Sequence, residues 1–530
     1  MAVLGRAFFR QRKDPSCKGR RGDGFFSGVC ILSLSAMIVK IVGLVYKIPM
    51  LRLLGSEGMG YFNSAYELYT LLCVIATAGL PVAMAVMIAG AESNGGRVER
   101  IFRVSRLTFL VLGVIGTAIL LGFAKPLATF LGSDRALYCI YAIAPTVFFI
   151  CMAGAYRGYF QGLGNMTPTA LAKVIEALGK LILGLIFASL ALRAGLPTEA
   201  VAAFAVLGLT LGALVSLFCL LVMKKAARAK LPPLLNEAEE GAILPKLLKL
   251  AIPVTLSSGV VSLTRVIDMT MILRRLQSLG QSSSEAFASY GNYTTLALPL
   301  FGLAPALIGS VALPLIPRLS RAIASADSKE ETNSVADALR LTSLVAMPAS
   351  VGLVLFAEPI LDLLFYGEDE AIAMTAPLLS ILGASVVLSC LITVTNAILQ
   401  AYSSAGLPIL SMALGSILKI VMAYFLIGVP QVGILGAPIS TFFCDLLICI
   451  MNFGFISRRM RELPSLSSVF IRPFVAALLS VSLARFLYNV AVDQISIDLR
   501  LLTLLSIALA AMLYLVLSLL LGVAKRHASP

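Results

Sequence analysis

Ionisable side chains within long apolar segments are the part of this sequence whose chemistry stands out. An ionisable group in hydrocarbon costs on the order of 3 kcal/mol, so such residues normally face a partner or a water-filled cavity. Cations outnumber acids among them, and a cationic interior suits an anion whose pyrophosphate or carboxylate oxygens accept several charge-assisted hydrogen bonds. The set comprises Lys40, Lys47, Lys173, Lys180, Arg265 and Lys419 with Glu67, Glu176, Asp268 and Asp445.

Spacing indicates which of these residues share a helix face. Lys40 and Lys47 are seven residues apart, and Arg265 and Asp268 are three apart. Arg265 and Asp268 could alternatively form an intrahelical pair that only lowers the cost of membrane insertion. We expect five cations to bind an anionic substrate: Lys40, Lys47, Lys180, Arg265 and Lys419. We expect three acids to balance charge or to bind a coupling ion, Na⁺ or H⁺: Glu67, Asp268 and Asp445.

Several kinds of catalytic and metal site have no support in the sequence. The nine cysteines include no C-x-x-C pair, and the only histidine, His527, stands near the C-terminus. Zinc sites, histidine-based acid-base catalysis and catalytic triads therefore lack their usual residues. No G-x-x-x-x-G-K-[ST] nucleotide loop is present. We expect neither an enzyme nor a bound metal or organic cofactor.

Long apolar runs follow one another along the chain. Of 530 residues, 59% are hydrophobic and 13% charged, with a mean hydropathy of +0.95. A membrane helix needs about 20 apolar residues, so the sequence predicts an all-α integral membrane protein. Fourteen candidate spans are centred near residues 40, 77, 116, 149, 181, 211, 262, 303, 347, 386, 417, 444, 480 and 511. We expect Lys173, Arg52 and Arg485 to extend to the membrane surface.

A repeated pattern divides the chain into two related halves. Gln161 to Lys180 and Gln400 to Lys419 each run from a glutamine, through a proline, to a lysine 19 residues later. Interrupted membrane segments that recur in this way are typical of transporters, with the substrate site between the repeats. The predicted units are a basic tail (1–26), a first lobe (27–223), a loop (224–247), a second lobe (248–456) and two further spans with a short tail (457–530).

Positive charge is unevenly distributed between the predicted loops. The N-terminal tail and the even-numbered loops are rich in Lys and Arg, whereas the odd-numbered loops are poor in both. The positive-inside rule therefore predicts that both termini face the cytoplasm, in a multi-pass protein of the cytoplasmic membrane. The formal net charge of +15 is spread over alternate loops and not gathered into one stripe, which argues against a nucleic-acid partner.

Two stretches of sequence resemble a known family. The segment 40–55 with Gly58 to Tyr61 resembles the first-span signature of the polysaccharide-exporter branch of the multidrug/oligosaccharidyl-lipid/polysaccharide (MOP) superfamily. Segments 252–258 and 313–317, with Asp268 and Tyr290-Gly291, resemble spans 7 and 8 of the stage V sporulation protein B family, which is related to MurJ-like lipid II flippases. The resemblance extends from about residue 27 to 523.

The resemblance implies a fold and a function. It implies two pseudo-symmetric six-helix lobes, as in the MATE-like fold, plus two C-terminal helices that form a groove for a polyprenyl tail. It implies a flippase that moves an undecaprenyl-pyrophosphate-linked peptidoglycan or polysaccharide precursor by alternating access, for envelope or spore-cortex synthesis. Lys40 and Arg265 fall near the positions where such proteins meet the pyrophosphate. Its implied partners are this glycan lipid, membrane lipids and, transiently, envelope synthesis enzymes.

The chain departs from the family pattern at two places, and two alternative functions stay open. MurJ-like flippases commonly carry an Arg-Asp pair late in span 1 and an arginine in span 2, where this chain has Tyr46-Lys47 and Cys73. The chain is therefore nearer the sporulation branch. An ion-coupled drug or metabolite exporter on the same fold would require an acidic interior. A membrane glycosyltransferase or ligase would require a large outer loop with catalytic carboxylates or histidine.

Overall fold

The computed structural model describes residues 21–91, 95–228, 243–325, 328–402, 406–460, 467–494 and 498–522. Throughout these residues the chain is helical and contains no strand, which confirms the all-α prediction. Twelve of the helices are long and apolar enough to cross a membrane. The chain is thus a multi-pass helical membrane protein, although the predicted count of fourteen spans is not confirmed.

The difference in count has two structural causes. Predicted span 1 and the first half of predicted span 2 lie in α2 (Arg21–Thr77), which is interrupted at Gly55, where φ is 66° and ψ is 177°. A side chain would be strained at this positive φ, so glycine permits the two helical limbs to join there without a loop. Predicted span 8 is divided among α10 (Ser283–Asn292), a π-helical turn η3 (Tyr293–Ala297), α11 (Leu298–Phe301) and α12 (Leu303–Ala324).

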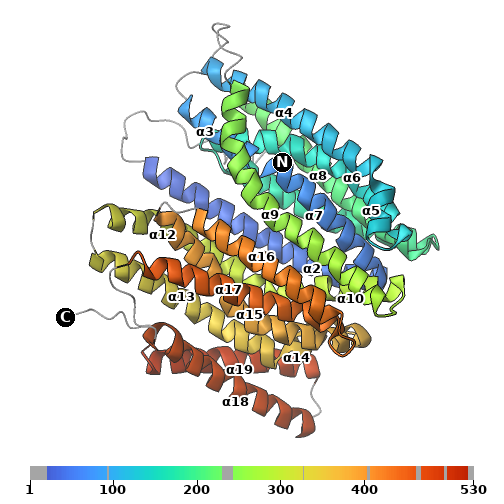
Figure 1. Cartoon of the computed structure of the whole chain (residues 1–530), viewed down its shortest axis with the longest axis vertical. Coiled ribbons are helices and arrows are strands. Elements are labelled where there is room, and N and C mark those ends of the chain that lie inside the picture. The colour runs from blue at the N-terminus through green and yellow to red at the C-terminus, as the bar shows by residue number, and fades with distance from the viewer. Residues whose placement is uncertain are drawn as a thin grey trace.

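The first half of the chain forms one helical lobe, which lies at the upper right in Figure 1. Glycines allow its helices to pack closely: a Cβ atom added at Gly208 would lie 2.2 Å from the backbone nitrogen of Gly184. Besides α2, the lobe contains α3 (Leu80–Gly90), α4 (Gly95–Gly122), α5 (Ala124–Phe130), η1 (Asp134–Ala136), α6 (Leu137–Gly162), α7 (Thr167–Arg193) and α8 (Thr198–Arg228).

The second half forms another lobe, followed by a helical pair at its edge (Figure 1). The pair consists of α18 (Arg472–Gln494) and α19 (Leu499–Leu520), which pack on α13 and α14 around their own apolar cluster. The lobe contains α9 (Ile243–Ser278), the broken segment α10 to α12, α13 (Ser328–Leu355), α14 (Ala357–Phe365), α15 (Asp369–Ala401), α16 (Gly406–Ile427), η4 (Gly433–Leu435) and α17 (Gly436–Ser457), and η5 (Ser467–Ile471) precedes α18.

The lobes meet where glycines bring helix backbones together. A Cβ added at Gly60 of α2 would lie 2.1 Å from the carbonyl oxygen of Phe287 in α10, and one at Gly291 would lie 2.1 Å from that of Ser56. Further along the bundle, a Cβ at Gly79 would lie 2.1 Å from the carbonyl oxygen of Ala251 in α9. The two lobes are therefore in backbone contact at two separate levels.

Parts of several predicted regions lie outside the described residues. These are most of the predicted tail 1–26, the centre of the predicted loop 224–247, and the C-terminus with His527. The proposed unit boundaries and the orientation of the termini stay predictions.

Candidate functional site

Charged residues that are distant in sequence gather where the two lobes meet. Glu67 of α2 lies within electrostatic range of Lys47 on the same helix, of Arg265 and Asp268 on α9, and of Lys419 on α16. The helix α9 packs against both α2 and α16 (Figure 1). The structure thus brings together five of the eight predicted site residues, from three helices.

Asp268 is paired with Lys419 and not with the arginine on its own helix. The Lys419 ammonium lies 2.7 Å from Asp268 Oδ2, and the two side chains are 18% and 13% exposed. The predicted alternative, an intrahelical Arg265–Asp268 pair, is absent from the ion pairs of the described residues. Asp268 Oδ1 is buried and has no hydrogen-bond partner in this part of the chain. The pair joins α16 to α9.

Lys47 is held by the irregular segment of the second lobe. Its ammonium donates to the carbonyl oxygen of Thr294 at 2.5 Å, within the π-helical turn η3. The neighbouring Asn63 amide donates to the hydroxyl oxygens of Thr294 and Thr295, each at 2.9 Å. A π-helical turn departs from regular i→i+4 bonding, and such turns often occur at functional positions. Lys47 and Asn63 therefore connect α2 to the break in predicted span 8.

Lys180 lies in an aromatic cage. Its ammonium is 4.6 Å from the ring centroid of Tyr66, 5.0 Å from that of Tyr46 and 5.5 Å from that of Phe62, all on α2. Lys180 makes no ion pair with any described residue. Aromatic faces attract a cation through their quadrupole, so the three rings stabilise the charge in place of a carboxylate.

Lys40 and Arg265 differ from the other predicted cations. Both are exposed, and neither makes a hydrogen bond or an ion pair within the described ranges. They are on neighbouring helices, α2 and α9, and the charge of Arg265 acts on Lys40. Two like charges near one another can bind an anion that neutralises both, and the charge of Arg265 also acts on Glu67.

Asp445 and Glu67 are the predicted acids that lack a protein cation in direct contact. Asp445 Oδ2, on α17, is buried and has no hydrogen-bond partner among the described residues, although the charge of Lys419 acts on it. Glu67 is half-buried and likewise makes no ion pair in the described structure. Both carboxyl groups could hold a proton, because a buried carboxylate without a partner is unfavourable.

The structure contains two charged pairs that the sequence analysis missed. Arg157 of α6 lies 2.5 Å from Glu176 of α7, with side chains 15% and 23% exposed. Lys224, assigned above to a loop, is 8% exposed, contacts Glu99 at 3.1 Å and lies 3.3 Å from the Phe102 ring centroid. The signal for Arg157 was present, since it is the charged residue within the apolar run of predicted span 4.

Arg485 and Arg52 do not simply extend to the membrane surface as predicted. The Arg485 guanidinium lies over the rings of Phe356 and Tyr488, and its Nη1 is buried without a hydrogen-bond partner in the described part. Arg52 donates to the carbonyl oxygen of Tyr366 at 3.1 Å. Between α14 and α15, burial raises the pKa of Glu368, and the charge of Arg52 opposes this shift.

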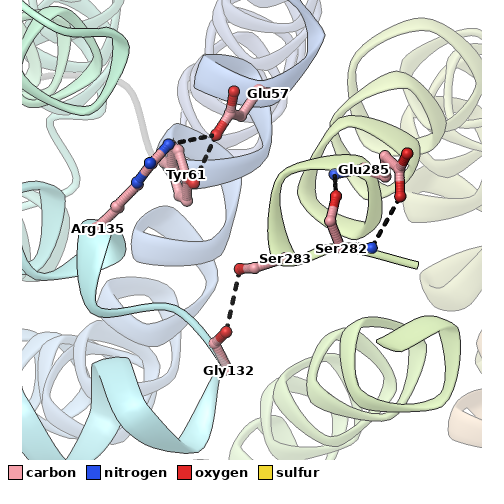
Figure 2. Close-up of polar contacts among 7 residues, drawn as sticks. All are labelled: Glu57, Tyr61, Gly132, Arg135, Ser282, Ser283 and Glu285. Carbon is pink, nitrogen blue, oxygen red and sulfur yellow. Dashed lines mark hydrogen bonds and ion pairs between the residues drawn. The ribbon is translucent and has the colours of Figure 1, made fainter. Parts of the chain in front are cut away.

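The lobes are also joined by polar contacts at the Gly55 end of α2 (Figure 2). Ser283, at the start of α10, donates to the carbonyl oxygen of Gly132 at 3.1 Å, and Arg274 of α9 donates to that of Phe130 at 2.8 Å. Within the first lobe, Glu57 accepts from Tyr61 at 2.7 Å and faces Arg135 at 3.5 Å. The two interlobe contacts use main-chain carbonyl groups, which sequence patterns do not identify.

Among the described residues, no group of three or more His, Cys, Asp or Glu side chains is placed to hold a metal ion. What the arrangement offers is a pair of unpartnered cations, an interlobe ion pair and two carboxyl groups that can bind protons. These features suit binding and movement of an anion.

Two family models match the chain. A sequence model described as "Polysaccharide biosynthesis protein" matches residues 25–322, and a second, described as MatE, matches residues 253–425.

Three Bacillus subtilis (strain 168) proteins are similar over most of the chain. Stage V sporulation protein B is 27% identical, covering 82% of this chain and 84% of the relative. The uncharacterized membrane protein YabM is 26% identical, covering 80% and 78% respectively. Lipid II flippase MurJ is 25% identical, covering 81% and 82%.

Solved structures share the fold. One described as lipid II flippase MurJ in an inward closed conformation aligns with a TM-score of 0.68 and 16% identity, covering 93% of this chain and 99% of that one. An inward-facing multidrug resistance MATE family transporter of the MOP superfamily aligns with a TM-score of 0.61 and 17% identity, covering 79% and 98%. The second structure covers less of this chain than the first does.

Proposed function

The chain belongs to the polysaccharide biosynthesis protein family, and from this premise we propose that it flips a polyprenyl-pyrophosphate-linked glycan precursor across the cytoplasmic membrane. It is a membrane transporter of the MOP superfamily, similar to flippases, which are not enzymes. The finer substrate assignment, a precursor like lipid II, is part of this proposal. The name of one relative, lipid II flippase MurJ, supports it.

The proposal rests on a difference among the five predicted cations: three are held by groups of the protein, and two are free. Lys419 is paired with Asp268, Lys47 is hydrogen-bonded to η3, and Lys180 is surrounded by aromatic rings. Lys40 and Arg265 are exposed and without such partners in the described structure. Facing hydrocarbon, each would cost on the order of 3 kcal/mol, so we place them toward a water-accessible interior.

A pyrophosphate group fits these two cations. Its oxygens can accept hydrogen bonds from the Arg265 guanidinium in a bidentate arrangement and from the Lys40 ammonium as a point charge. Because α2 belongs to the first lobe and α9 to the second, one anion would bridge both lobes. Movement of one lobe against the other would then change which side of the membrane reaches the anion.

The rest of the topology follows from the same proposal. The two limbs of α2 and the broken segment α10 to α12 would account for three crossings, which restores fourteen spans with both termini in the cytoplasm. The Gly55 end is then the outer end, closed by the contacts of Gly132 and Gly291. The proposed partners are the glycan lipid, membrane lipids and the enzymes that make and consume it.

The test is transbilayer movement of labelled lipid II in proteoliposomes. We expect wild-type protein to move the lipid and Arg265→Ala to lose at least about tenfold in rate, because one charge-assisted hydrogen bond is worth roughly 1.5–3 kcal/mol. Arg193→Ala is the matched control, since Arg193 is an exposed cation in the last turn of α7. Arg265→Lys should retain part of the rate.

Monodisperse elution and unchanged thermal unfolding must first show that each variant is folded. Movement by Arg265→Ala at the wild-type rate would contradict the proposed site. Equal movement in protein-free vesicles and in wild-type vesicles would contradict lipid II as the substrate.

A further inference from the structure

Lys419 lies within reach of the charge of two carboxyl groups on two different helices. It pairs at 2.7 Å with Asp268 of α9. The second carboxyl group, Asp445 of α17, lies within electrostatic range of Lys419 but makes no ion pair in the described structure. Its Oδ2 is buried and has no hydrogen-bond partner there. One ammonium thus has two acids available and is in contact with one.

Among the described residues, the neighbours of Asp445 do not supply a second cation. Charged and titratable groups that interact with it are Lys419 of α16, Tyr293 of η3, and Cys444 and Cys449 of its own helix. On the α15 side, the polar contacts of α17 are made by the neutral Thr395 and Asn396, which bond to Asn452. An ionised carboxylate in such surroundings costs several kcal/mol, whereas a protonated carboxyl group does not.

We infer that Asp445 is a proton-binding site that controls the anion site through Lys419 and Asp268. The structure shows Lys419 paired with Asp268 and Arg265 free within the described residues, and we assign this arrangement to protonated Asp445. When Asp445 releases its proton to water, its carboxylate attracts the Lys419 ammonium away from Asp268. Asp268 then takes a new cation, and Arg265, three residues earlier on the same helix, is in position to provide it.

This exchange has a consequence for binding that rests on the proposed function. With Arg265 paired to Asp268, only Lys40 remains free for the pyrophosphate. Protonation of Asp445 therefore favours binding of the anion, and by thermodynamic linkage the bound anion favours protonation. The helix that carries Asp268 and Arg265 also makes the Gly79 contact with the first lobe, so the exchange can act on the interlobe joint.

The proton site can be tested without any lipid substrate. Infrared difference spectra of the whole protein in nanodiscs should show, at neutral pH, a protonated-carboxyl carbonyl band with a component that Asp445→Asn removes; a component that stays in the variant belongs to another acid, such as Glu67. In wild-type protein the Asp445 component should also disappear on alkaline titration. Asp498→Asn is the control, because Asp498 is exposed and caps α19 through its side chain, a role that asparagine also fills.

A band unchanged in Asp445→Asn, or no band at neutral pH in wild-type protein, would overturn the inference while leaving the flippase proposal intact. Conversely, a band at Asp445 without lipid II movement would retain the proton site and refute the proposed cargo.

The coupling is tested by binding of farnesyl pyrophosphate as a function of pH. Wild-type affinity should fall at least about tenfold as the Asp445 band disappears, whereas Asp445→Asn should keep its affinity over the same interval. The pyrophosphate of the probe also titrates, but this affects both proteins equally. Comparing the wild-type profile with that of Asp445→Asn therefore removes its contribution. Identical pH profiles for the two proteins would overturn the coupling.

Discussion

Lys180 and Lys419 end the two copies of the repeated segment, each 19 residues after a glutamine, yet the structure gives them different surroundings. Lys180 faces three aromatic rings of α2, while Lys419 contacts a carboxylate of α9. In the first lobe the nearby acid Glu176 is already paired with Arg157. The lysine at this position is thus stabilised by aromatic rings in one lobe and by an ion pair in the other.

The difference bears on whether each lysine can change its partner: we infer that Lys180 keeps its aromatic partners, whereas Lys419 can exchange one carboxylate for another. The rings around Lys180 belong to one helix, and Glu176, the acid one turn before Lys180, is already paired with Arg157. Lys419 has Asp445 as a second acid on α17. The two copies of the repeated segment therefore end in lysines with different surroundings.

Breaking the Lys419–Asp268 pair should have the largest effect on stability. We expect Lys419→Met to lower the free energy of unfolding by about 3–5 kcal/mol, because a buried carboxylate is left without its cation. Asp268→Asn should cost less, since Lys419 can then contact Asp445. Denaturant titrations in detergent would measure both, and the double variant should recover part of the loss. Equal, additive losses in the two single variants would contradict the exchange.

The pair in the first lobe should be the next most sensitive. Arg157→Met leaves Glu176 buried without its arginine, but Lys180 is four residues later on the same helix and can replace it. We therefore expect a loss of about 1–3 kcal/mol, smaller than that of Lys419→Met. Thermal unfolding of Arg157→Met and Arg157→Met/Lys180→Met would show this rescue. No further loss in the double variant would rule it out.

The smallest effect is expected for Lys180→Met alone. A thioether packs favourably against aromatic rings, so it replaces a cation–π contact by a contact of similar size, and stability should change by less than about 1 kcal/mol. The matched change Lys419→Met provides the contrast. If Lys180→Met proved as destabilising as Lys419→Met, the two sites would not differ in the way described.

Sequence analysis predicted the helical class, the family and the residues of the charged region. It did not predict which charges pair, because Asp268 and Lys419 are 151 residues apart and Asp268 has a nearer candidate in Arg265. Local spacing favoured the nearer residue, whereas helix packing determined the partner. Arg157 was overlooked for the same reason, since its acid is on the next helix.

The sequence did not predict how its fourteen apolar runs correspond to helices. A hydropathy profile treats each apolar run separately, whereas two runs meet at Gly55 without a loop and a π-helical turn divides another. Both features depend on single backbone conformations. Gly55 itself gave a usable signal, because glycine is the residue that adopts its positive φ without strain.

The contact of Gly60 with α10 has a consequence for the electrical insulation of the membrane. A Cβ atom there would lie 2.1 Å from a backbone oxygen, so no water molecule fits between the two backbones at this point. If the protein binds protons as we propose, a continuous file of water beside its cargo would let ions leak across the membrane. Direct contact between backbones at Gly60 blocks such a file between α2 and α10, and it involves no interlocked side chains.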